Sequence, residues 1–81
     1  MGVMRVLCSQ GDAVYTWDEE KVEIGDPGAR EAIEEAERII REAQARGAVA
    51  FRAVPGQPAE RIRDFDPKAD EIIVVPRIVG G

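Results

Sequence analysis

The sequence predicts an α+β domain in which a mixed sheet of four to five strands packs on one long helix, in the order ββαββ. Three observations predict this class. The chain has 81 residues, which is enough for one domain. Two segments of strand-like composition precede a segment with helical periodicity, and further strand-like segments follow it. We therefore expect one domain over residues 1–76 and a flexible C-terminal tail over residues 77–81.

The first two strands form a predicted hairpin. Residues 3–8 are mostly apolar, Gly11-Asp12 interrupts the pattern, and residues 13–17 are rich in β-forming residues. Tyr15 and Trp17 are two positions apart and therefore share one face of their strand. We expect these two aromatic side chains either to form a contact patch for a partner or to pack in the core against the helix.

The segments around this hairpin carry weaker signals. Met1 and Gly2 are assigned no structural role, and the polar residues 18–25 predict a connecting loop. Within that loop, three consecutive acidic residues from Asp18 to Glu20 have the ligand type for a hard cation, but we expect them to be solvated surface. Cys8 cannot form a disulfide within the chain because it is the single cysteine, and its apolar surroundings predict a buried, inert thiol.

A helix is predicted between Asp26 and Gly47. Asp26 is a capping residue type, Pro27 suits the first helical position, and Gly47 is a common helix stop. The apolar residues of this segment recur every three or four positions and predict one buried face: Ala29, Ala32, Ile33, Ala36, Ile40 and Ala43, with Ile39 at its edge. The acidic residues precede arginines by four positions and predict a solvated opposite face: Glu34 with Arg38, Glu37 with Arg41, and Glu42 with Arg46.

The C-terminal half predicts three further strands. Residues 48–54 predict a half-buried strand, and the proline-rich residues after it predict a turn. Residues 61–65 alternate charged with apolar side chains and suit a short edge strand, because charges discourage pairing with other chains. Residues 72–75 are apolar without alternation, as in a strand at the centre of a sheet. We assign Phe51 and Phe65 to the core.

Charge and composition argue against several classes of function. A net charge of −5 and a pI near 4.7 argue against nucleic acid as a partner. The longest apolar run is too short to cross a bilayer and no signal segment opens the chain, so we expect a soluble, cytoplasmic protein without a membrane partner. The absence of histidine removes Ser-His and Cys-His dyads and imidazole zinc sites. We expect no enzyme activity, no bound cofactor and no metal.

Gly80 and Gly81 end the sequence, and we expect the chemistry of the protein there. A terminal carboxylate flanked by residues without Cβ can enter a narrow active site and accept attack at its carbonyl carbon without steric hindrance. With 8 Gly in 81 residues, composition alone places Gly at both final positions in roughly 1% of chains. The alternative is an end without functional significance.

The element order together with this ending resembles the ubiquitin-like β-grasp family, which includes ubiquitin and the small prokaryotic sulfur carriers. The similarity is most specific over residues 70–81, Asp-Glu-Ile-Ile-Val-Val-Pro-Arg-Ile-Val-Gly-Gly. The tails of the molybdopterin-synthase and thiamine-thiazole sulfur carriers likewise place an acidic turn before an apolar strand, often Pro, and Gly-Gly. Residues 11–17, 47–51 and 65–67 also resemble bacterial ubiquitin-like proteins.

Two features depart from these families. The helix is longer and more charged than in the sulfur carriers. Lys21 and Lys68 are the only lysines, so polymeric chains of this protein are not expected.

The resemblance implies that an adenylating enzyme uses ATP to activate the carboxylate of Gly81, after which a thiol or sulfur donor attacks the carbonyl. Transfer to a target lysine would make the protein a modifier, and conversion to a thiocarboxylate would make it a sulfur carrier. The implied partners are the activating enzyme, target proteins or a sulfur acceptor, and a deubiquitinase-like peptidase. The alternative from another class is a β-grasp interaction module whose Gly-Gly end is incidental.

The same resemblance assigns contacts to the tail. Ile78 and Val79 would grip the channel of the activating enzyme, and Arg77 would pair with an acidic rim. Residues 77–81, fully extended, would reach roughly 17 Å from the sheet. That length is sufficient to enter a deep nucleotide site.

Overall fold

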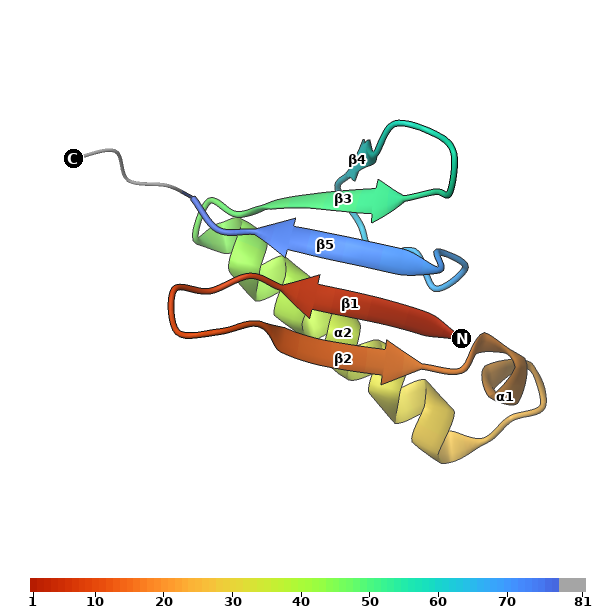
Figure 1. Ribbon diagram of the computed structural model, residues 1–81. Helices are drawn as coiled ribbons and strands as arrows, with labels where there is room; N and C mark the ends of the chain where they lie inside the picture. The colour runs from red at the N-terminus through yellow and green to blue at the C-terminus, as the bar shows by residue number, and fades with distance from the viewer. Residues whose placement is uncertain (78–81) are drawn as a thin grey trace.

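The computed structural model describes residues 1–77, which form a five-stranded mixed sheet with a helix packed across one face (Figure 1). The predicted α+β class and the predicted order of the main elements are confirmed. The elements in chain order are β1 (Gly2–Val6), β2 (Ala13–Trp17), α1 (Glu19–Glu23), α2 (Pro27–Ala45), β3 (Val49–Ala53), β4 (Glu60–Ile62) and β5 (Glu71–Val75).

The strand β5 lies at the centre of the sheet, whose order is β2-β1-β5-β3-β4. It runs parallel to β1 and antiparallel to β3, and the two hairpins β1/β2 and β3/β4 lie on either side. Ile72 and Val74 are fully buried against the helix side, whereas Ile73 and Val75 point to the other face and are half-buried. The central position predicted for residues 72–75 is confirmed.

The helix α2 begins and ends where the sequence predicts. The side chain of Asp26 accepts a hydrogen bond from the backbone N–H of Gly28 at 3.1 Å, and Pro27 occupies the first helical position. At the other end Gly47 has φ +94°, and Ala48 donates back to the carbonyl of Ala43 at 3.0 Å. With 19 residues α2 has an ordinary length, so the expectation of a long helix is corrected.

The predicted apolar face of α2 packs on the sheet. Ala29, Ala36 and Ile40 are buried, and the remaining predicted residues are partly buried against the same core. The core between α2 and the sheet is built mainly from Met4, Trp17, Ala36, Ile40, Ala50, Ile72 and Val74.

The aromatic residue Trp17 anchors one end of this core and is 2% exposed. Its indole N–H donates to the carbonyl oxygen of Pro67 at 2.8 Å, and its ring meets Phe65 edge-to-face with centroids 4.7 Å apart. The core assignment of Phe65 is confirmed. Tyr15 and Trp17 share a face as predicted, and α2 covers that face, so the structure agrees with the second of the two alternatives, packing in the core.

Gly2 has a structural role that its sequence context does not indicate. It pairs with Trp17 in the β1/β2 ladder and is buried beneath the indole ring. A Cβ atom at this position would lie 2.1 Å from Cε2 of Trp17. Glycine is therefore required because a large ring occupies the space above the backbone.

Three local predictions are corrected. The segment predicted as a loop contains the short helix α1, whose first turn Asp18 caps by accepting from the N–H groups of Glu20 and Lys21. The edge strand predicted over residues 61–65 is the shorter β4, and only its place at the edge is confirmed. Phe51 lies opposite Ile73, on the face away from α2, and is therefore not a core residue.

Candidate functional site

The C-terminal end of β5 marks the place from which the predicted tail leaves the domain. Because β5 is parallel to β1 and antiparallel to β3, the end of β1, the start of β3 and the C-terminal end of α2 surround this point (Figure 1). Leu7 fixes the strand there by donating its N–H to the carbonyl of Val74 at 2.9 Å. Pro76 and Arg77 follow β5 and are exposed. The predicted site residues Ile78, Val79, Gly80 and Gly81 lie outside the described residues.

Arg77 packs its side chain against Gly47 at the end of α2. A Cβ atom on Gly47 would come within 2.9 Å of Cδ of Arg77, so the aliphatic stem of Arg77 lies directly over the glycine backbone. The carbonyl end of a helix carries partial negative charge and favours a cation at this position. The stem of Arg77 therefore contacts the domain, and its predicted pairing with an acidic rim on a partner stays a prediction.

A cavity of about 450 Å³ opens beside Pro76 and Arg77, and we call it the root pocket. Its wall is mostly apolar and is formed by Val6, Leu7, Ala43, Ala48 and Val74. These residues come from β1, α2, β5 and the connections between elements, so periodicity within a single segment gives no signal for the cavity. The small side chains at the end of α2 are the one hint in the sequence, because they leave space that larger residues would fill.

Cys8 also lines the root pocket and is exposed, which corrects the expectation of a buried thiol. The chain turns away from the sheet after β1 ends at Val6, so Cys8 no longer follows the alternation of the strand. No described residue supplies an imidazole or a second thiol beside it. The position makes Cys8 a chemical reporter on the cavity and gives no evidence of catalysis.

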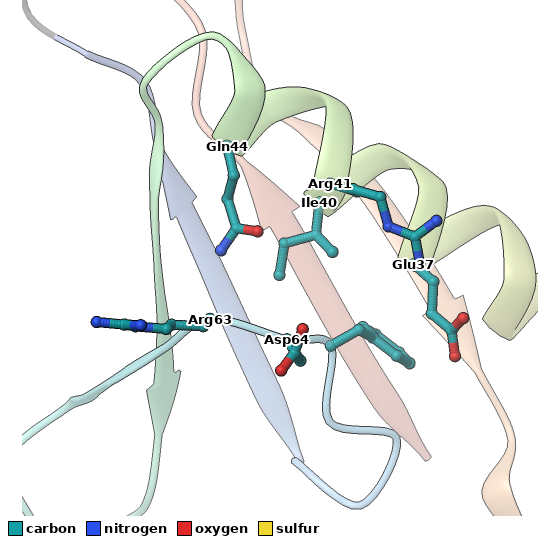
Figure 2. Close-up of a pocket in the computed structure, with 7 residues that line it drawn as sticks. Glu37, Ile40, Arg41, Gln44, Arg63 and Asp64 are labelled. Atoms are coloured by element: carbon teal, nitrogen blue, oxygen red, sulfur yellow. The ribbon is translucent and has the colours of Figure 1, made fainter.

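A second, more polar cleft of about 240 Å³ lies between α2 and residues 63–65 (Figure 2). Figure 2 shows Ile40 and Gln44 directed from α2 into this space, with Glu37 and Arg41 along its side and Arg63 extended away from the helix. The lining mixes both charges and includes no cysteine, serine or lysine that could act as a nucleophile. We assign this cleft no chemistry.

Charged residues elsewhere have structural roles. Arg52 donates to Asp66 at 2.7 Å and to Glu60, which ties β3 to β4 and to the loop before β5. These two carboxylates, Asp66 first, raise the pKa of Arg52 above its ordinary value. The side chain of Asp18 is engaged in capping α1, and residues 1–77 contain no cluster of three potential metal ligands.

The sheet face opposite α2 is covered by no described element (Figure 1). This face, which we call the open face, carries the apolar side chains of Val3, Val14, Phe51, Ile73 and Val75. Arg5 lies among them, between Val14 and Ile73, and forms an ion pair with Glu71 at 3.3 Å. Val14 is 51% exposed and the other apolar residues are half-buried by their neighbours. This face has no separate signal in the sequence, because β3 and β5 are apolar at successive positions on both faces.

No family model matches this chain, and neither curated proteins nor solved structures give a significant match. Within residues 1–77, no helix combines the length and the apolar character that a membrane span requires.

Proposed function

We propose that this chain is a small ubiquitin-like protein whose Gly81 carboxylate is adenylated by a partner enzyme and then transferred or converted to a thiocarboxylate. The observation that carries the proposal is the end of β5. A central strand, hydrogen-bonded on both sides, ends at Val75 and is followed by exposed Pro76 and Arg77, which lead in sequence to Ile-Val-Gly-Gly.

The arrangement of the sheet also supports the proposal. The hairpins β1/β2 and β3/β4 lie on either side of β5, β1 and β5 run parallel, and α2 crosses one face of the sheet, which is compatible with a β-grasp fold.

The chemistry requires only an acyl group from this chain. A carboxylate oxygen of Gly81 attacks the α-phosphorus of ATP, pyrophosphate leaves, and an acyl-adenylate forms. A nucleophile then attacks the carbonyl carbon and AMP leaves. A target lysine amine yields an isopeptide and makes the protein a modifier, while a sulfur donor yields a thiocarboxylate and makes it a sulfur carrier. Both outcomes share the same first intermediate.

Trapping with hydroxylamine tests this shared intermediate. The purified protein is incubated with ATP and a lysate of its own host, and hydroxylamine is added to intercept any activated carbonyl. Mass spectrometry of the C-terminal peptide is expected to show an ATP-dependent hydroxamate at Gly81. The chain that lacks Gly81 serves as the matched control and is expected to give none. Failure to form the hydroxamate, or equal labelling of both chains, contradicts the proposal.

The open face favours a second candidate function, that of a protein-interaction module. Phe51, Ile73 and Val75 form an apolar group on this face, which no described element covers, and exposed apolar groups commonly mark docking surfaces. This function depends on residues such as Phe51 and not on the C-terminus. Removal of Gly81 is therefore expected to leave such an interaction intact, whereas Phe51→Ser is expected to weaken it, as measured by co-precipitation from the host lysate.

A further inference from the structure

The root pocket is an opening at one end of the layer between α2 and the sheet. Val6 and Val74 form its floor on the helix-facing side of the sheet, and Ala43 and Ala48 form the wall at the end of α2. The alanines leave the end of the core unfilled, where longer side chains would close it. Its volume of about 450 Å³ lies within the range of cavities that bind ligands.

The charge around this cavity differs from that of the molecule as a whole. The chain carries a net charge of −5, yet the charged residues that line the root pocket are Arg46 and Arg77. Among residues 1–77, no aspartate or glutamate lines it. The cavity therefore combines an apolar interior with a positive border.

The guanidinium group of Arg46 is available to pair with a partner, because the ion pair predicted within α2 does not form. The sequence predicts that Glu42 pairs with Arg46, but both carboxylate oxygens of Glu42 accept from Arg38, at 3.1 and 3.2 Å. No described carboxylate lies within ion-pair distance of Arg46. The backbone N–H of Arg46 caps α2, and its side chain takes no part in that cap.

We propose that the root pocket binds one apolar side chain of a partner protein, with carboxylates of the same partner segment pairing with Arg46 and Arg77. The apolar wall selects the apolar side chain, and the two guanidinium groups select acidic neighbours. The identity of the partner rests on the proposed function: it is the protein that holds the adjacent tail. The binding chemistry itself follows from the cavity and its charges.

The place of the cavity explains why a weak contact there is useful. Pro76 and Arg77 belong both to the lining and to the start of the tail, so a protein that holds the tail also reaches the root pocket. Two linked contacts bind more tightly than either does alone, because the second forms at high effective concentration. The root pocket then distinguishes this chain from other chains that merely end in Gly-Gly.

Cys8 makes the occupancy of the cavity measurable. It is the only thiol of the chain, it is exposed, and it lines the root pocket. The probes are three blocked pentapeptides, Asp-Asp-Phe-Asp-Asp, Lys-Lys-Phe-Lys-Lys and Asp-Asp-Ser-Asp-Asp, tested against the full chain. The rate at which uncharged iodoacetamide alkylates Cys8 is measured with each peptide, and amide chemical shifts locate the binding.

The acidic phenylalanine peptide is expected to slow alkylation and to shift the amide signals of Val6 and Ala48. The other two peptides are expected to do neither. Slowing by the basic peptide, or shifts centred on the open face at Phe51 and Ile73, would overturn the proposal. So would the absence of any effect with peptide present at saturating concentration.

Two pairs of variants separate the cavity from general effects. Arg46→Gln is expected to weaken binding of the acidic peptide about threefold, as for one exposed ion pair, and Arg30→Gln at the other end of α2 to leave it unchanged. Ala43→Leu is expected to fill the cavity and abolish binding, whereas Ala45→Leu on the exposed side of α2 is expected to have no effect. The fluorescence of Trp17 checks that each variant is folded.

The result is independent of the tail chemistry, because the assay contains neither ATP nor an activating enzyme. Peptide binding without hydroxamate formation would contradict the proposed function and leave the root pocket assignment standing. The converse result is hydroxamate formation while Arg46→Gln and Ala43→Leu bind the acidic peptide with the affinity of the wild type. That result would leave the proposed function standing and would contradict the root pocket assignment.

Discussion

Replacement of Gly2 by alanine is expected to destabilise the domain far more than a single methyl group normally does. An added Cβ atom would lie 2.1, 2.2 and 2.5 Å from Cε2, Cζ2 and Nε1 of Trp17. The ring cannot move aside at low cost, because Phe65 packs against it and its N–H is bonded to Pro67 at 2.8 Å. Either the backbone of β1 or the indole ring must shift.

The magnitude follows from these contacts. Overpacking of a tight core costs about 1–3 kcal/mol, and weakening of the indole hydrogen bond adds about 0.5–1.5 kcal/mol. We expect Gly2→Ala to lower the free energy of unfolding by about 2–4 kcal/mol. For a domain of this size that loss corresponds to a fall in Tm on the order of 10–25 °C.

Urea unfolding followed by the fluorescence of Trp17 measures this loss, since Trp17 is the only tryptophan and is buried. Gly28→Ala is the matched control, because the closest atom to its added Cβ is Oδ1 of Asp26 at 3.6 Å. That variant is expected to be as stable as the wild type or up to about 1 kcal/mol more stable. A loss below about 0.5 kcal/mol for Gly2→Ala would refute the close packing of Gly2 beneath Trp17.

Three further predictions concern residues outside this contact. Gly47→Ala is expected to lower the free energy of unfolding by about 1–3 kcal/mol, because φ of Gly47 is +94°. Adding Arg77→Ala to that variant removes the side-chain contact and should recover only a small part of the lost stability. Full recovery in urea unfolding would show that the backbone conformation of Gly47 is not the cause. Because the folded-state pKa of Arg52 is raised, its stabilising contribution is present below the ordinary arginine pKa and is lost only as pH rises through the folded-state value. Arg52→Gln should therefore lower Tm equally at about pH 6 and about pH 9, and a difference that disappeared by the higher pH would contradict this. Cys8 is expected to react with iodoacetamide in the folded protein at close to its rate in urea, and strong protection would argue against its exposed position.

The elements with local signals were predictable from the sequence. The caps and the periodicity of α2 define its ends and its buried face, and the unbroken apolar run at Ile72 places β5 at the centre of the sheet. A signal for α1 was also present, since Asp18 followed by Glu19 and Glu20 combines a capping residue with acids in the first turn. Five residues are too few to show helical periodicity, so the polar composition of this segment predicts a loop.

Features that depend on pairing between strands were not predictable. β3 is apolar at successive positions, so sequence alone cannot decide whether Ala50 or Phe51 faces α2. The register with β5 decides it, because Ala50 pairs with Val74 and Phe51 with Ile73. The burial of Gly2 likewise depends on its place opposite Trp17, fifteen positions later in the sequence.

The candidate site likewise has one part that the sequence predicts and one part that only the fold reveals. The Gly-Gly ending was evident in the sequence, whereas the root pocket is assembled from three separate stretches of the chain, residues 6–8, 43–48 and 74–77, and required the fold. Arg46 shows most clearly how far the sequence alone can predict side-chain pairs. The i,i+4 spacing predicts an ion pair with Glu42, whereas in the structure Glu42 pairs with Arg38. Several equivalent partners at helical spacing make such pairs ambiguous from sequence.

Mass spectrometry of the protein isolated from its own cells tests the central claim, activation of the C-terminal carboxylate, most directly. We predict that part of the population carries a thiocarboxylate at Gly81 or is joined through Gly81 to a lysine of another protein. We also predict that a chain expressed without Gly81 carries neither. Recovery of an unmodified carboxylate alone, under every growth condition tested, would contradict the account.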